Sequence, residues 1–147
     1  MKSHTSDKHY LSKTILAGVF AGIAATLGNL FYDLFFRSFT QFVPSQIINV
    51  ATIIFSTMLL FVVAGLLYFF LSKFVKQGIL FYIIVLAILF ILCFSWGLHI
   101  NRSADPAVTA DFRVLFLGIV SISGLFATFF VPYLMQHPSI FMDEYDY

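Results

Sequence analysis

The chain has 147 residues, of which 61% are hydrophobic and only 10% are charged, and its mean hydropathy is +0.97. An ordinary soluble domain carries about 25% charged residues. A soluble fold of this size has too little interior to hide so much apolar surface, so we expect most of that surface to face lipid. The composition therefore excludes a water-soluble enzyme and a disordered protein, and a formal net charge of +1 predicts no nucleic-acid partner. Cys93 is the single cysteine, so no internal disulfide is expected.

Four apolar stretches are long enough to cross a bilayer as α-helices, which takes about 20 residues each. They cover residues 14–36, 47–71, 78–98 and 114–135. Their continuous apolar pattern favours helices over barrel strands, which alternate and are about half as long. The first stretch exceeds the apolar core of a signal peptide, so we expect a retained anchor. The predicted fold is an all-α integral membrane four-helix bundle, with residues 1–147 forming a single domain.

The distribution of basic residues predicts that both termini are cytoplasmic, because cytoplasmic loops are enriched in Lys and Arg. The terminal side carries Lys2, Lys8, Lys13, Lys73 and Lys76, and the other side carries Arg37, Arg102 and Arg113. Residues 136–147 form a short acidic and aromatic tail, interpreted as a solvated end or as a docking segment for a partner.

Small residues mark the helix faces that we expect to pack inside the bundle, because helices in lipid associate through close contact. The first span carries one such stripe and the fourth span another, at helical spacing: Gly18, Gly22 and Ala25, and Gly118, Ser121, Gly124 and Thr128. Homodimerisation through these faces is the alternative. The 20 phenylalanines are interpreted as lipid-facing bulk rather than a pigment or quinone pocket. Pro132 lies near the end of its span, where we expect a kink to disturb little.

Polar side chains within and beside the spans gather in the half of the membrane that faces outward in the predicted orientation. This distribution predicts a bundle that is tight on the cytoplasmic side and has a polar pocket in its outer half. The residues of this candidate binding site or structural network are Asn29, Asp33, Arg37, Asn49, Thr52, Ser56, Ser95, His99, Asp111 and Arg113.

Two of these positions have competing interpretations. Asp33 and Arg37 are one helical turn apart, which favours an ion pair that anchors the end of the span. The functional alternative is a cation or proton site that Asp33 shares with Asn29 and Asn49. Asn29 lies deeper and its amide needs a partner, for which we expect Thr52 or Ser56.

No residue pattern indicates catalysis, a metal site or a cofactor. A metal held by His99 with Asp105 or Asp111 matches no specific spacing, and no second histidine lies at the depth that haem ligation needs. Walker, GxGxxG, HExxH, CxxC and GxSxG motifs are absent from the sequence.

The first helix reads AGVFAGIAATLGNL over residues 17–30, a serine, Ser95, lies near the end of the third, and Val131-Pro132 ends the small-residue fourth. These features resemble small four-helix bacterial membrane proteins that are grouped as a family of unknown function. The chain departs from that pattern in its fourth helix, where residues 121–124 replace an expected histidine. The resemblance implies the four-helix fold and a location in a bacterial inner membrane, and it implies no activity.

Three classes of function fit this sequence. We favour a non-enzymatic membrane module, such as an accessory, assembly or envelope protein, with a membrane-protein partner or a second copy of the chain. A small transporter or channel would use the polar pocket as a solute or ion vestibule. The third class is a lipid- or quinone-binding protein or a membrane enzyme.

Overall fold

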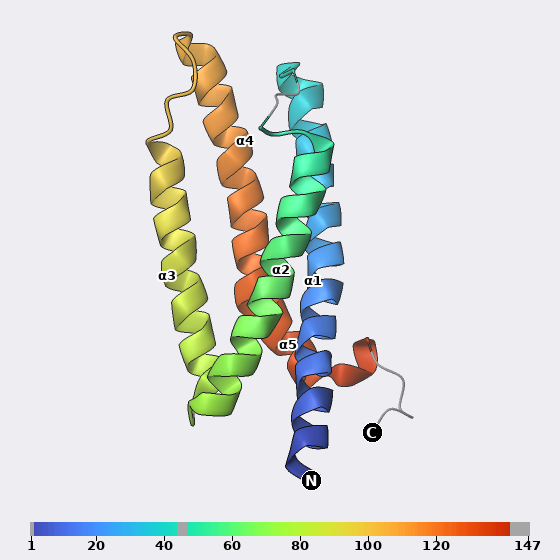
Figure 1. Cartoon of the computed structure of the whole chain (residues 1–147). Helices are drawn as coiled ribbons and strands as arrows, with labels where there is room; N and C mark the ends of the chain where they lie inside the picture. Colours follow the sequence, from blue (N-terminus) through green and yellow to red (C-terminus); the bar gives the residue numbers. More distant parts are fainter. Residues whose placement is uncertain (1, 44–46, 142–147) are drawn as a thin grey trace.

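The computed structural model describes residues 2–43 and 47–141, and every regular element in these ranges is helical. Four long helices run antiparallel in chain order: α1 (Lys2–Thr40), α2 (Val50–Phe74), α3 (Gly78–Leu98) and α4 (Pro106–Leu125) (Figure 1). A π-helical turn, η1 (Phe126–Phe130), continues α4 into α5 (Val131–Gln136), and a short 3-10 turn, η2 (Pro138–Ile140), follows. The predicted all-α four-helix membrane fold is confirmed, since four helical segments are long and apolar enough to span a bilayer.

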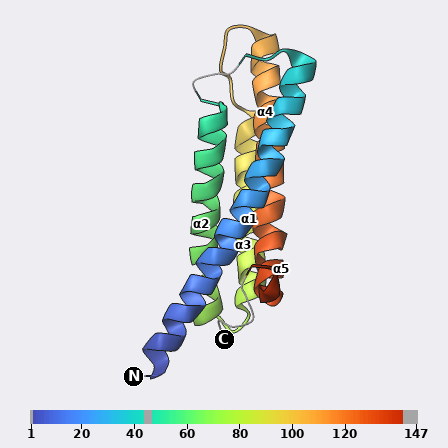
Figure 2. The same ribbon diagram turned by 90° about the vertical axis from the view of Figure 1, so that its right-hand side faces the viewer.

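The third helix has the predicted bounds, whereas the first and fourth helical segments extend beyond the predicted spans at both ends, because hydropathy marks the apolar stretch and not the hydrogen-bonded helix around it. α1 has 39 residues, a length of about 58 Å at 1.5 Å per residue, and its first turns project past the bundle (Figure 2). The Lys73 ammonium bonds the Asp7 carboxylate at 2.7 Å beside this projection. We call the end that holds the start of α1 the inner end and the opposite end the outer end, following the predicted orientation.

Glycines bring α1 and α2 into the closest contact in the bundle. Gly18 and Gly22 face Phe61 of α2, while Gly65 of α2 faces the backbone of Thr14 and Ile15. A Cβ atom at Gly18 or Gly65 would meet backbone atoms of the neighbouring helix. Ala25 continues the stripe and is fully buried. The small-residue face of α1 therefore packs within the bundle, against α2.

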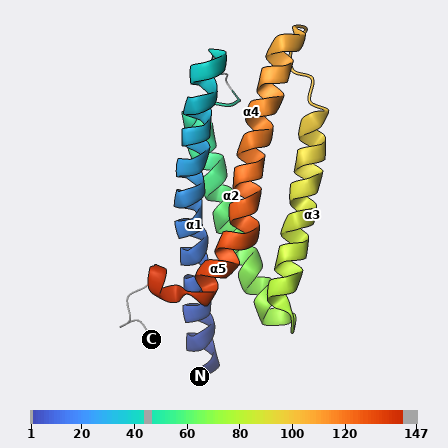
Figure 3. The same ribbon diagram turned by 180° about the vertical axis from the view of Figure 1, so that it is seen from behind.

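The small residues of α4 face two different helices. Gly118 lies against the ring of Tyr32 in α1, and Gly124 lies against the ring of Phe90 in α3. Thr128 is buried and Ser121 is half-buried. Figure 3 shows α4 between α1 and α3, as these contacts require.

Pro132 changes the geometry of the fourth span, which corrects the expectation of a minor disturbance. The Val131 N–H donates to the Phe126 carbonyl, a bond five residues back that defines the π-turn. The next such bond would join the nitrogen of Pro132, which has no hydrogen, to the carbonyl of Ala127. The buried Tyr82 hydroxyl of α3 donates to that carbonyl instead, at 2.6 Å. A side chain of another helix thus supplies the hydrogen bond that proline removes.

Two hydrophobic clusters fill the described bundle, one at each end. The inner cluster joins α1, α2, α3 and α5, and its largest buried members include Phe61, Tyr68 and Tyr82. The smaller outer cluster contains Ile48, Ile53, Phe112 and Leu115. The predicted tail begins by folding back, because Phe141 contacts Phe20 of α1 with ring centroids 6.4 Å apart. Residues 142–147 of that tail lie outside the described residues.

Candidate functional site

The structure separates the predicted polar residues into local groups, so they do not form one pocket. One group closes the connection between α1 and α2, another caps α2, and a third holds the connection between α3 and α4. Asn29 alone reaches the centre of the bundle, where it meets two residues outside the predicted set. Of the predicted residues, Ser56 lines a pocket between α2, α3 and α4.

Arg37 joins Asp33 to the connection that follows α1. Its Nε lies 2.9 Å from both carboxylate oxygens of Asp33, whose residue is 3% exposed. The same guanidinium donates to the carbonyls of Phe42 and Ile48, each at 3.2 Å. The predicted ion pair is therefore present. It anchors the end of α1, and the surrounding protein buries it. This arrangement gives no support to a cation site shared by Asp33, Asn29 and Asn49.

Asn49 and Thr52 form the N-terminal cap of α2. The Thr52 N–H donates to Asn49 Oδ1 at 3.0 Å, and the Asn49 N–H donates to Thr52 Oγ1 at 3.0 Å. This reciprocal capping box satisfies two backbone donors at the start of the helix. The predicted second span thus begins as a helix at Val50 and not at residue 47. The two side chains are engaged in local structure.

The remaining predicted residues lie at the outer end of α3 and α4. His99 Nδ1 is 2.7 Å from the carbonyl of Ser95, and both residues are exposed. Arg113 donates to the Ile100 carbonyl and to Asn101 Oδ1, at 2.7 and 2.6 Å, and so holds the loop. Asp111 is half-buried. Across the described residues, no three His, Cys, Asp or Glu side chains converge as a metal site would require.

Asn29 ties three helices together in the interior. Its Nδ2 donates to Thr57 Oγ1 of α2 at 3.0 Å and to Ser123 Oγ of α4 at 2.8 Å. All three residues are buried, and Asn29 is 0% exposed. The expected partners Thr52 and Ser56 are wrong: Thr52 caps its own helix and Ser56 is exposed. The sequence selected the wrong face of α2, because neighbouring residues point 100° apart around a helix axis.

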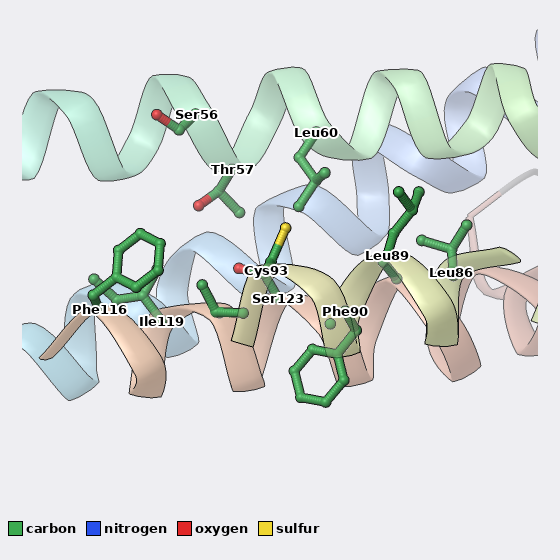
Figure 4. Close-up of a pocket in the computed structure, with 13 residues that line it drawn as sticks. Ser56, Thr57, Leu60, Leu86, Leu89, Phe90, Cys93, Phe116, Ile119 and Ser123 are labelled. Carbon is green, nitrogen blue, oxygen red and sulfur yellow. The ribbon is translucent and has the colours of Figure 1, made fainter. Parts of the chain in front are cut away.

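A pocket of about 250 Å³ lies beside this network, between α2, α3 and α4. Thr57 and Ser123 contribute hydroxyls from facing walls, as Figure 4 shows. Apart from Ser56, the rest of the lining is apolar and includes Leu60 and Leu89, with the thiol of Cys93 turned toward Leu60. We call this space the Thr57–Ser123 pocket.

The pocket opens sideways toward the lipid between α2 and α3. Leu60 of α2 and Leu89 of α3 line it and are 43% and 49% exposed. α2 and α3 meet near the inner end, where Tyr68 and Tyr82 pack edge to face, and they separate toward the outer end (Figures 1 and 3). α3 instead follows α4, where Gly97 faces the side chains of Phe116 and Leu117. The side of the pocket between α2 and α3 therefore lacks a helical wall.

Toward the inner end the bundle interior is apolar and packed. Phe61, Tyr82 and Leu134 are fully buried there, and Phe61 belongs to the closest helix contact. The Tyr82 hydroxyl is bound to the Ala127 carbonyl. The pocket consequently has no described polar continuation toward the inner end of the bundle.

Sequence reasoning missed Thr57, Ser123, Gly65 and Tyr82. Thr57 and Ser123 lie one and two positions from residues that the stripes selected, Ser56 and Ser121, so helix rotation was the missing information. Gly65 lies alone within an apolar run, and only its position opposite Gly18 reveals its role.

No protein-family model, no curated protein and no solved structure matches this chain.

Proposed function

We propose that this chain is a non-enzymatic membrane protein that takes an apolar molecule from the bilayer into the Thr57–Ser123 pocket. The observation that carries the proposal is a pocket that is open to lipid, has apolar walls and contains two hydroxyls held by one buried amide. Ligand sites in proteins commonly combine apolar walls with a few placed polar groups. The basic residues support an orientation with cytoplasmic termini, and the resemblance supports a bacterial inner membrane as the location.

The size of the pocket selects part of a lipid-like molecule. An apolar cavity of about 150 Å³ accommodates benzene. A pocket of about 250 Å³ therefore has room for one ring or a stretch of one hydrocarbon chain, but not for a whole phospholipid. The rest of a longer ligand would extend between α2 and α3 into the bilayer.

The chemistry of the walls favours binding over catalysis. The described lining residues include no carboxylate, no histidine and no cationic side chain. The thiol and the hydroxyls in the pocket therefore have no general base beside them. Asp33 and Arg37 neutralise each other at the outer end of α1, where they line a separate pocket of about 320 Å³ and not the Thr57–Ser123 pocket.

A transporter or channel is the less supported function. A polar solute crossing the bilayer needs partners along its path, because an unsatisfied polar group in hydrocarbon costs several kcal/mol. Phe61 and Tyr82 occupy that path with close-packed side chains. The Thr57–Ser123 pocket thus suits a ligand that already dissolves in lipid.

The test is to identify what the protein retains when it is extracted from its membrane into bilayer discs. Leu89→Trp should fill the pocket at low cost, because Leu89 is 49% exposed and the larger ring has room to turn. Leu92→Trp is the matched control, since Leu92 lies on the same helix, is 60% exposed and does not line the pocket.

We expect mass spectrometry to find one apolar species at a fixed ratio to the wild-type chain and to Leu92→Trp. That species should fall several-fold with Leu89→Trp. Equal retention by the two tryptophan variants, or no species enriched over the bulk lipid, would overturn the proposal.

A further inference from the structure

The hydrogen-bonding capacity of the Thr57 and Ser123 hydroxyls is only partly used. A serine or threonine hydroxyl offers one hydrogen to donate and two lone pairs to accept. Asn29 Nδ2 fills one lone pair on each oxygen, at 3.0 and 2.8 Å. Each hydroxyl therefore still has its own hydrogen to donate.

Several other helical hydroxyls of this chain donate that hydrogen within their own helix, whereas those of Thr26 and Ser72 are buried without a partner in the described part of the chain. Thr14, Ser38 and Thr40 each donate to a carbonyl three or four residues earlier in α1, at 2.8 to 2.9 Å. Thr57 and Ser123 make no such bond within the described part of the chain, although both are buried and both line the pocket. A buried donor without an acceptor is costly, and more so in a membrane.

We infer that the Thr57–Ser123 pocket selects a neutral, lipid-soluble ligand that carries a hydrogen-bond acceptor, a carbonyl oxygen, which binds the two hydroxyls at once. The inference deepens the proposed function and rests on it. The two hydroxyls converge because one amide nitrogen binds both, so they can share one acceptor between α2 and α4. Asn29 is the positioning residue, since its two N–H groups occupy lone pairs and leave the hydroxyl hydrogens to the ligand.

The walls exclude the other head groups that membrane molecules carry. A phosphate or carboxylate would need a cationic partner, and an ammonium group would need an anionic one. The described lining residues provide neither. A fatty-acyl ester and a quinone both carry a suitable carbonyl, and the mass of the molecule retained in bilayer discs distinguishes them.

Two probes of equal chain length test the selectivity: undecan-2-one, with a carbonyl, and undecane, without one. Cys93 reports occupancy, because it is the single cysteine and lies in the pocket wall. The measurement is the mole fraction of probe in bilayer discs that halves the rate at which a membrane-permeant maleimide modifies Cys93. A ketone labelled with ¹³C at the carbonyl adds an infrared band that moves to lower wavenumber when the carbonyl accepts hydrogen bonds.

We expect the wild-type chain to bind undecan-2-one about three- to tenfold more tightly than undecane, the gain of one net hydrogen bond. Asn29→Leu/Thr57→Val/Ser123→Ala removes the two hydroxyls together with the amide N–H groups that they would otherwise leave free, so it should bind the two probes equally and lose the infrared shift. Ser56→Ala is the matched control, because it removes a hydroxyl from the same lining that Asn29 does not bind, and it should keep both signals. The wild-type comparison of the two probes holds even if the triple variant fails to fold.

Each failure has its own meaning. Equal protection by both probes with an unshifted carbonyl band would overturn the acceptor selectivity and leave the apolar pocket in place. No protection of Cys93 by either probe would overturn the pocket proposal itself. An infrared shift that survives in Asn29→Leu/Thr57→Val/Ser123→Ala would assign the hydrogen bond to other residues and contradict the inference.

Discussion

The inner and outer halves of this bundle are stabilised in different ways. In the inner half, glycines let α1 and α2 approach until backbone meets backbone, and aromatic side chains fill the remaining space. In the outer half, polar side chains close the connections, and the helices leave a pocket between them. Close packing in lipid needs small residues, whereas a chain that leaves the membrane needs hydrogen bonds for its exposed backbone. The location of the pocket follows from this difference.

The largest effect should come from the outer half, at the Asp33–Arg37 pair. Arg37→Gln leaves a carboxylate with 4% side-chain exposure and no counter-charge. Removing one partner of a buried pair typically costs about 3–5 kcal/mol. Chemical unfolding in mixed micelles should show a loss of that order, and Asp33→Asn/Arg37→Gln should recover part of it because no charge remains buried. A double variant as unstable as the single one would show that the two backbone bonds of Arg37 matter more than its charge.

The next effect tests the inner contact between α1 and α2. Gly18→Ala puts a Cβ against the backbone of Phe61 and Gly65, so the helices must separate. Overpacking of this kind costs about 1–3 kcal/mol. Gly28→Ala is the matched control in the same helix, because its Cβ would meet only the flexible Ile122 side chain at 3.3 Å. Equal thermal stability of the two variants in detergent would show that the close contact does not limit stability.

The smallest of these effects concerns the bond between Tyr82 and the π-turn. Tyr82→Phe leaves the Ala127 carbonyl without its donor and should cost about 1 kcal/mol. Pro132→Ala restores a backbone N–H, so Tyr82→Phe should cost less in that background. Thermal unfolding of both single variants and the double variant measures this coupling. Strictly additive costs would mean that Tyr82 does not compensate for the proline.

The sequence predicted the class and order of the helices because twenty-residue apolar stretches have few alternatives in a membrane. It also predicted the ion pair of Asp33 and Arg37, because residues four apart lie side by side on one helix and the contact needs no second element. Contacts between helices depend on the rotation of each helix about its axis and on the angle at which two helices cross, and hydropathy predicts neither. Thr57 was therefore missed beside Ser56, and Tyr82 was missed because its acceptor exists only after Pro132 alters the fourth span.

The missing wall between α2 and α3 has a consequence for how the pocket is filled. A molecule that enters there never crosses water, so its supply is set by its mole fraction among the lipids. Occupancy follows the ratio of that mole fraction to the dissociation constant in the same units. An abundant membrane component thus occupies the pocket with only a small preference over bulk lipid, and a rare one needs the discrimination that the two hydroxyls provide.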